Sequence, residues 1–265
     1  MMQKCNNNES NIYFLKYAPF HINFKEIINS IIFAFIFAFG FQTFFYQPFT
    51  IPSGSMKPGL QVGDYLLVQK FAYGYNNSSL SFALNQLKFF DQSLLFNDPK
   101  RGDIIVFLLP TDKSCHYIKR LIGLPGDKII IKEGLLYIND IVVKRQYIGQ
   151  KILIDTSNAP ETNSIFRETL PNGISYKIYK ENNTKAYSYN FDHNNTPIYK
   201  VPKGHYFFMG DDRDNSIDSR FLNKVGYVHQ NKILGKAQIL FWTFDFSICD
   251  FVTELKTHRV FKQIK

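Results

Sequence analysis

Cysteine is scarce in this 265-residue sequence, and the usual catalytic motifs are missing. Cys5, Cys115 and Cys249 lie far apart, with no CxxC and no Cys/His pairing, which excludes a zinc ribbon, a CxxC redox motif and a disulfide framework. HExxH, GxSxG, SxxK and GxxxxGK are absent, and no two of the six histidines stand at metal-ligand spacing. We therefore expect neither a metal ion nor a cofactor, and any nucleophile has to act without a histidine partner.

Charge is absent from residues 27–56, although the whole chain carries a net charge of +9. Residues 27–46 read IINSIIFAFIFAFGFQTFFY, and as a helix they would span about 30 Å, the thickness of a bilayer's hydrocarbon core. A buried core helix and a cleavable signal peptide are the alternatives. A signal peptide should have a shorter apolar region that ends in small residues, whereas this one ends in FFYQPF. The pattern favours an uncleaved transmembrane anchor.

The flanking charges indicate an orientation and a partner. Lys4, Lys16 and Lys25 precede the anchor with only Glu9 and Glu26 opposing them, and a short lysine-bearing flank tends to stay cytoplasmic. The large domain then faces outward. The excess of 31 Lys and Arg over 22 Asp and Glu is scattered rather than gathered around aromatic residues, so we expect attraction to anionic lipid headgroups and no nucleic acid.

Beyond the anchor the pattern is typical of β-structure. Short runs rich in Ile, Val, Leu, Tyr and Phe, each bounded by Gly, Pro, Asn or Asp, occupy residues 65–70, 103–109, 117–122, 128–132, 135–143, 205–209 and 235–243. Asn139-Asp140 predicts a hairpin turn and residues 124–127 (LPGD) a second turn. Alternating strand and helix patterns are absent, so a doubly wound sheet is excluded.

The predicted fold is therefore mainly β: a single transmembrane helix followed by an antiparallel, barrel-like sheet. Residues 145–199 are rich in Asn and Thr and predict a less regular inserted β subdomain. We divide the chain into a cytoplasmic tail (1–26), the anchor (27–46), a catalytic β domain (47–144 and 200–265) and the insertion (145–199).

The first candidate site segment follows the anchor directly. Residues 51–60 read IPSGSMKPGL, in which proline fixes φ and glycine permits costly dihedral angles, so a serine hydroxyl can be held in a rigid turn. A generic linker between anchor and domain is the plain alternative.

The second segment places a lysine within an apolar strand. In YIKRLIG, Lys119 shares a strand face with Tyr117 and Leu121, while Ile118 and Arg120 point to the other face. Desolvation on such a face lowers the pKa of a lysine from about 10.4, which makes the amine a candidate general base. A lysine reaching solvent at a sheet edge is the alternative.

The third segment, residues 209–220 (MGDDRDNSIDSR), is dense in turn formers. It lacks the spacing and the terminal Glu of a calcium-binding EF-hand loop. We expect charge-paired scaffolding instead, with Asp218 paired to Arg220 and Asp211 to Arg120. Ser216 is placed to orient a neutral lysine amine.

Together, IPSGSM-x-P-x-L-x-x-GD, RGDIIVF, YIKRLIGLPGD and GDDRDNSIDSR, in this order behind an N-terminal anchor, closely resemble the motif boxes of bacterial type I signal peptidases. The matches cover residues 49–70, 101–107, 117–132 and 205–242. The resemblance implies a membrane-bound serine protease that cleaves signal peptides from exported preproteins after small residues, at Ala-x-Ala sites. Its location would be the bacterial inner membrane, with the export machinery nearby. The sequence itself predicts a single span, whereas the best-known members of the family have two.

Position by position, the resemblance implies Ser55 as nucleophile and Lys119 as general base. The Ser53 hydroxyl and the Ser55 backbone N–H would form the oxyanion hole, and Ser216 would orient Lys119. Asp211, Arg120, Asp218 and Arg220 would be scaffolding charges. The residues that resemble the substrate-binding positions are Phe49, Ile51, Pro52, Met56, Leu60, Val106, Tyr117 and Ile118.

Two residues depart from the usual motifs of the family. Asp212 replaces a more usual Asn, and Gly59 stands where Thr is common; both leave the two catalytic candidates intact. Ser55 follows Tyr46 by nine residues, at most about 30 Å, so the nucleophile lies near the outer membrane surface.

Two alternative functions are open. A self-cleaving repressor-type peptidase would share the Ser/Lys pair but needs no span. A catalytically idle membrane-anchored domain that binds exported chains is the alternative of another class.

Overall fold

The computed structural model describes residues 23–76, 79, 94–95, 97–112, 114–154, 160–181, 191–243 and 261–264. Two compact units divide the chain, Met1–Gly40 and Phe41–Lys265. The first contains most of the apolar helix and the second contains the β-structure.

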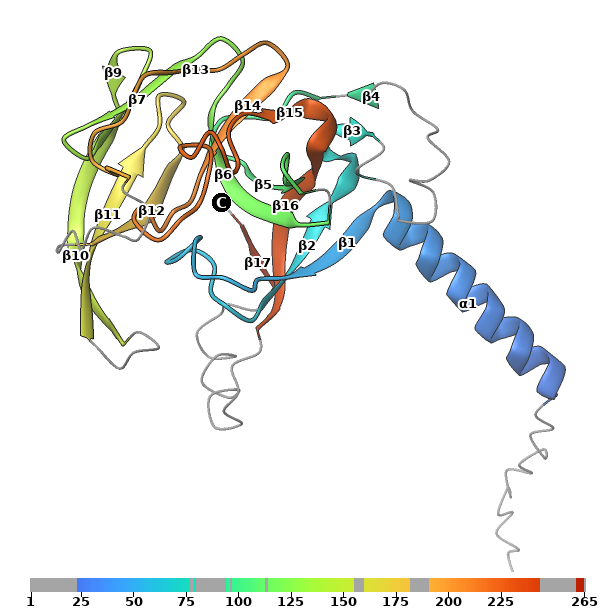
Figure 1. The fold of residues 1–265 in the computed structure, drawn as a ribbon. Helices are drawn as coiled ribbons and strands as arrows, with labels where there is room; N and C mark the ends of the chain where they lie inside the picture. Colours follow the sequence, from blue (N-terminus) through green and yellow to red (C-terminus); the bar gives the residue numbers. More distant parts are fainter. Residues whose placement is uncertain are drawn as a thin grey trace, which may run out of the picture. The chain divides into compact units, whose positions relative to one another are not determined.

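The apolar run forms helix α1, Phe24–Phe44, drawn in blue in Figure 1. Its 21 residues give a length of about 31 Å at 1.5 Å per residue, and among the described residues it is the one helix long and apolar enough to cross a membrane. Its apolar side chains are exposed, as lipid contact requires: Phe33 by 72% and Phe35 by 77%. The helix begins three residues earlier and ends two residues earlier than the predicted 27–46.

Local interactions explain both ends of α1. Asn23 precedes the helix, and its side-chain oxygen accepts a hydrogen bond from the Lys25 backbone N–H at 3.2 Å. At the other end Tyr46 has already entered a strand, where it is paired with Gln69. The hydrophobicity that predicted the anchor does not distinguish a helix end from the apolar strand that follows it.

The main sheet is antiparallel, curled and half-barrel in form, and carries most of the predicted strands (Figure 1). Its order is β1-β2-β16-β5-β6-β14-β15, with β17 paired to β16. The strands are β1 (Tyr46–Thr50), β2 (Asp64–Gln69), β5 (Ile104–Leu108), β6 (His116–Gly123), β14 (His205–Met209), β15 (Val228–His229), β16 (Ile233–Thr243) and β17 (Lys262–Gln263). Short 3-10 helices, η1 (Lys70–Ala72) and η2 (Gln230–Lys232), precede β3 and β16.

A four-stranded sheet of order β13-β7-β8-β9 contains the predicted hairpin. Its strands are β7 (Lys128–Lys132), β8 (Leu135–Ile138), β9 (Ile141–Val142) and β13 (Tyr199–Lys200). Asn139 and Asp140 join β8 to β9 with φ of 52° and 65°, the left-handed values of a tight hairpin turn. A two-stranded pair, β3 (Gly74–Tyr75) and β4 (Leu94–Leu95), lies apart from these sheets.

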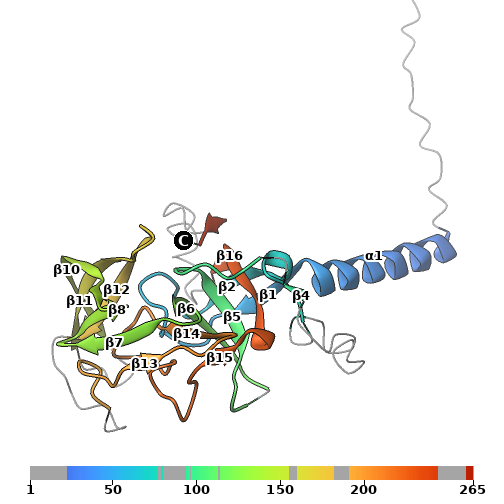
Figure 2. The same cartoon turned by 90° about the horizontal axis from the view of Figure 1, so that it is seen from above.

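The inserted segment is more regular than its composition predicted. It contains a three-stranded antiparallel sheet, β10 (Lys144–Ile154), β11 (Pro160–Thr169) and β12 (Ser175–Glu181). Tyr176 and Ile178 of β12 point into a core shared with β7 and β8, and both views show β10–β12 beside that sheet (Figures 1 and 2). Apart from Thr162, Asn163 and Thr169, the Asn and Thr residues of the insertion lie outside these three strands, so the composition of the whole segment concealed the strand pattern.

Strand β5 is buried on both faces and contributes residues to apolar clusters on each side of the sheet. Ile105 and Phe107 lie in one apolar cluster, where Phe107 stacks on Phe208 with ring centroids 4.6 Å apart. Ile104 and Val106 point to the opposite face. Its neighbour β6 is therefore held rigidly, and β6 carries Lys119.

Candidate active site

The serine segment forms a tight turn directly after β1. The Ile51 backbone is bonded to Asp64 and Gly63, and the Lys57 N–H donates to Gly54 O at 2.8 Å. Ser55 is only 7% exposed, whereas Ser53 is exposed and its Oγ lies 3.3 Å from Ser55 Oγ. The turn therefore presents two serine hydroxyls side by side.

Lys119 reaches this turn from β6. Its Nζ lies 2.6 Å from Ser55 Oγ and 3.1 Å from Ile118 O, and 5.2 Å from the centroid of the Tyr117 ring. The side chain is 4% exposed. Burial lowers the pKa of Lys119 from 10.5 to about 8, although the negative charges of Asp218 and Asp211 oppose that change. A lower pKa increases the neutral fraction, the form that can accept a proton.

The loop after β14 packs against the serine turn. The Asp212 N–H donates to Ser55 O at 3.1 Å, and the Gly210 N–H donates to Asp218 Oδ2 at 2.9 Å. Ser216 is buried beside Gly210. No hydrogen bond joins Ser216 to Lys119 in the part of the chain that the structure describes, since the lysine amine is bonded to Ser55 and Ile118 instead.

Two buried ion pairs hold the loop, with the partners expected from the sequence. Arg120 donates to both oxygens of Asp211, at 2.8 and 2.7 Å. Arg220 donates to both oxygens of Asp218, at 2.8 Å each. Burial alone would raise the pKa of Asp218, but the charge and hydrogen bonds of Arg220 outweigh it and hold that pKa below the ordinary value.

The residues that resemble substrate-binding positions gather around Ile118. On one side lies a cluster of Val68, Val106 and Leu234 against which Phe49 packs. On the other side lies a cluster that contains Ile51, Met56 and Leu60. Tyr117 is half-buried and Pro52 is exposed. Four of the eight residues thus lie on the strands β1, β5 and β6, and the other four lie in residues 51–60, the segment that contains the serine turn.

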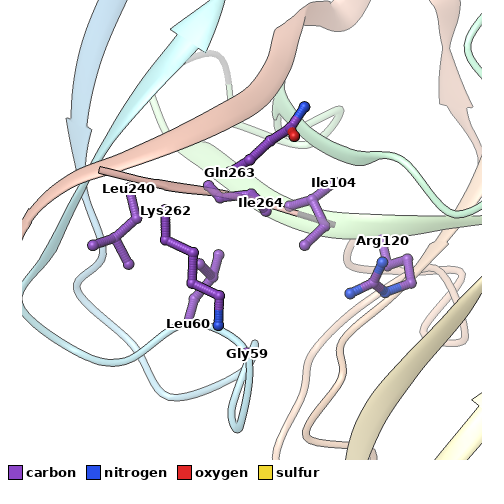
Figure 3. Close-up of a pocket in the computed structure, with 8 residues that line it drawn as sticks. All are labelled: Gly59, Leu60, Ile104, Arg120, Leu240, Lys262, Gln263 and Ile264. Carbon is purple, nitrogen blue, oxygen red and sulfur yellow. The ribbon is translucent and has the colours of Figure 1, made fainter. Parts of the chain in front are cut away.

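A cavity of about 450 Å³ lies on the Arg120 side of β6. Figure 3 shows its lining: Gly59, Leu60, Ile104, Arg120, Leu240, Lys262, Gln263 and Ile264. Neither Ser55 nor Lys119 lines it. Strand β17 forms one wall of the cavity, a contact that no local sequence pattern predicts.

Four further residues, three of them buried and Arg145 half-buried, lie next to the ion pairs and were not singled out from the sequence. They are Arg145, Glu168, Tyr176 and Arg213. Arg213 falls within the GDDRDNSIDSR box, whereas Glu168 lies in the Asn/Thr-rich insertion, where no spacing or motif marks it. Only its burial and its partners distinguish it.

Comparison with known proteins gives a consistent result. The family model "Signal peptidase, peptidase S26" matches residues 24–242. A signal peptidase I from Rickettsia massiliae is 39% identical over 239 residues, covering 88% of this chain and 87% of that protein. The signal peptidase I of Rickettsia typhi is 38% identical, with 91% and 94% covered.

Among solved structures, a signal peptidase I from Enterococcus faecalis V583 aligns with a TM-score of 0.31 and 25% identity, over 53% of this chain and 97% of that one. The family match extends from the apolar helix to strand β16, and the two Rickettsia relatives each cover most of the sequence. This chain therefore belongs to the signal peptidase I family of S26 peptidases.

Proposed function

We propose that this protein removes N-terminal signal peptides from exported preproteins, with Ser55 as nucleophile and Lys119 as general base. The observation that carries the proposal is the 2.6 Å distance between Lys119 Nζ and Ser55 Oγ, two buried atoms from residues 64 positions apart. A lysine with a lowered pKa at hydrogen-bond distance from a hydroxyl is the geometry that a Ser/Lys hydrolase needs.

The reaction follows from this geometry. The neutral Lys119 amine takes the proton of Ser55 Oγ as that oxygen attacks the scissile carbonyl carbon, forming a tetrahedral intermediate. The C–N bond then breaks, and the Lys119 ammonium returns the proton to the leaving amine of the mature chain. Water, deprotonated by the same amine, then attacks the acyl-Ser55 ester; the C–Oγ bond breaks, the Lys119 ammonium returns the proton to Ser55 Oγ, and the signal peptide leaves.

The oxyanion of the intermediate requires donors close to Ser55. We assign this role to the Ser53 hydroxyl and the Ser55 backbone N–H. The 3.3 Å distance between the two serine Oγ atoms supports the assignment, because the substrate carbonyl must approach Ser55 Oγ itself.

The substrate would bind as an extended strand. On β6, Ile118 and Lys119 are paired with β5, while the pairing with β14 starts only at Arg120, so the other edge at Ile118 and Lys119 has no strand partner among the described residues. A peptide added there would run alongside Ile118 and present alternate side chains to the two apolar clusters. Both clusters are well filled, so they would admit small side chains such as Ala.

The location also belongs to this proposal. We place α1 in the bacterial inner membrane as a single span, with the N-terminus cytoplasmic and the β-structure outside. Exported preproteins then reach the site from the export machinery, and the positive net charge favours anionic headgroups at the membrane surface.

Cleavage of a defined preprotein tests the function. The full chain in detergent would be incubated with a preprotein that carries an Ala-x-Ala site, and the products would be followed by mass spectrometry. Ser55→Ala and Lys119→Ala should each lower the rate by several orders of magnitude. Lys132→Ala, an exposed lysine on β7, is the matched control and should cleave normally.

Each other outcome has a meaning. Equal cleavage by the wild type and both site variants would show that a contaminant does the work. Absence of cleavage by a folded, lipid-supplemented wild type would replace the proposal with the idle binding domain.

A further inference from the structure

Glu168 is the most completely bonded carboxylate in the described structure, and it lies in the inserted sheet. It sits on β11 and is 1% exposed. Arg213 donates to both of its oxygens, with 2.7 Å to Oε1, and Arg145 donates to Oε1 at 2.8 Å. The Tyr176 hydroxyl donates to Oε2 at 3.0 Å. A buried carboxylate with these partners fixes the directions of two arginines and one tyrosine.

Tyr176 connects Glu168 to the strand that carries Lys119. The Arg120 guanidinium carbon lies 4.0 Å from the centroid of the Tyr176 ring. The same guanidinium is bidentate to Asp211 and donates to Gly102 O at 2.8 Å. Arg120 is therefore held from one face by a tyrosine whose hydroxyl is held by Glu168.

The backbone provides a second connection. The Arg213 N–H donates to Tyr179 O at 3.0 Å and the Tyr179 N–H donates to Asp211 O at 2.9 Å, so residues 211–213 are bonded to β12. Between them, the Asp212 N–H donates to Ser55 O. A displacement of Arg213 is thus transmitted to the carbonyl of the nucleophile.

The charges around Glu168 explain how its loss would affect the Arg120–Asp211 ion pair. Among the described residues, the ion pairs of Arg120, Arg145 and Arg213 are made with two carboxylates, Glu168 and Asp211. Two carboxylates raise the pKa of Arg213 through their charge: Glu168, which has the larger effect, and Asp211. Without Glu168, a buried and unpaired Arg213 would be drawn to Asp211, where it would compete with Arg120.

We propose that Glu168 is a positioning residue for the Ser55–Lys119 pair. By holding Arg213 and Tyr176, it keeps Arg120 on Asp211, and Asp211 and Asp212 against the serine turn. The inserted sheet, which carries Glu168 and Tyr176, then helps to hold Ser55 and Lys119 in position. This inference rests on the proposed function.

The variant Glu168→Gln tests the proposal, because it removes the charge and keeps the shape. The assay uses the full chain in detergent and a peptide with an Ala-x-Ala site, with kcat, KM, the pH–rate profile and Tm as readouts. We expect kcat to fall about 10- to 100-fold, the scale of a small misplacement of reacting groups, and KM to change less than about twofold.

The pH profile gives a readout that lost stability alone would not move. The charged groups that act on Lys119 are Asp218, Asp211 and Arg220, and it also faces Ser55 and the Tyr117 ring. Asp211 raises the pKa of Lys119. If Arg213 turns to Asp211 and neutralises it further, that pKa falls, so the acidic limb of the kcat profile should move to lower pH.

Rescue completes the test. In the double variant Glu168→Gln/Arg213→Gln the competing cation is gone and the net charge of the group is again that of the wild type, so most of the lost kcat and the wild-type acidic limb should return. Arg101→Gln, which breaks a part-buried ion pair with Asp127, is the stability control and should lower Tm without moving the limb.

The results separate the possible failures. A single variant with wild-type kcat and pH profile, or a double variant no better than the single one, would overturn the role of Glu168. Should Glu168→Gln fail to fold, the double variant alone carries the decision: wild-type-like kcat supports the proposal and a 10-fold or greater loss refutes it. Wild-type cleavage abolished by Ser55→Ala keeps the proposed function whatever the Glu168 variants do. A wild type that does not cleave removes both proposals.

Discussion

At the scale of single residues, the site depends on one buried amine. Lys119 is surrounded by Tyr117, Ser55 and the backbone of its own strand, with the nearest carboxylates already paired to arginines. No carboxylate therefore bonds the ammonium directly among the described residues. Burial without a direct counter-ion is what lowers the pKa of Lys119, and the lowered pKa suits the amine to the proposed role of general base.

The first prediction concerns pH. Only the neutral amine accepts the Ser55 proton, and the amine is neutral above its pKa of about 8. Activity should therefore rise with pH through about 8 and be lost below it. The measurement is kcat/KM for a peptide substrate from about pH 6 to pH 10. An acidic limb near the ordinary lysine value would contradict it. Lys119→Arg should be inactive throughout, because a guanidinium stays charged.

The second prediction concerns Ser53. Ser53→Ala removes one proposed oxyanion donor and should lower kcat by about 100-fold with little change in KM. Since Ser53 is exposed, Tm should stay at the wild-type value. Ser53→Thr keeps a hydroxyl and serves as the control, with most of the activity retained. Steady-state kinetics on the wild type and both variants are the measurement. An equal loss of kcat in Ser53→Thr, or no loss in Ser53→Ala, would contradict the prediction.

At the scale of elements, the loop after β14 fits closely against the serine turn. Gly210 is the point of closest approach: a Cβ there would lie 2.2 Å from Ser216 Oγ and 2.6 Å from Ser55 O. The second of these atoms is backbone and cannot turn away. Glycine at this position lets the loop bring Asp211 and Asp212 close to Ser55.

Gly210→Ala should therefore push the loop away from Ser55. We expect a loss of about 1–3 kcal/mol in the free energy of unfolding, as in other overpacked sites, and at least a 10-fold drop in kcat. Gly149→Ala is the matched control, because nothing lies within 4 Å of a Cβ at that position. Urea unfolding and peptide cleavage measure the two effects, and wild-type behaviour of Gly210→Ala would refute the packing argument.

At the scale of the whole molecule, buried ion pairs bind the inserted sheet to the main sheet. Glu168 joins β11 to the loop after β14, and Asp218 closes that loop on Arg220. Burial raises the pKa of Glu168, but the charges and hydrogen bonds of Arg213 and Arg145 outweigh it, so the net pKa lies below the ordinary value. Asp218 behaves in the same way.

This predicts the dependence of stability on pH. A carboxylate with a lowered folded-state pKa stabilises the fold fully above its unfolded pKa, near 4, and that contribution is lost as the pH falls through the folded-state value. The free energy of unfolding in urea should thus decline steadily below about pH 5. Glu168→Gln should flatten the decline, whereas Asp140→Asn, an exposed turn residue, should not alter it. Equal slopes in Glu168→Gln and wild type would contradict the argument.

The sequence by itself determined the local elements and the candidate chemistry. The uncharged run predicted helix α1, and β7 and β14 begin and end where the apolar runs do. Lys119 was marked by its place in an apolar strand and residues 51–60 by their turn-forming composition, while the choice of Ser55 came from the resemblance to type I signal peptidases. These features are readable because periodicity, turn residues and charge patterns act over a few neighbouring positions.

The tertiary structure alone decided which of these residues meet. The approach of Lys119 to Ser55 depends on the sheet order that places β6 near the turn after β1. Glu168 meets Arg213 across 45 positions and could not be distinguished from other acidic residues. Ser216 lies beside Gly210 rather than bonded to Lys119. Such pairings depend on how distant strands pack, and a buried charge acquires its partners only when that packing excludes water.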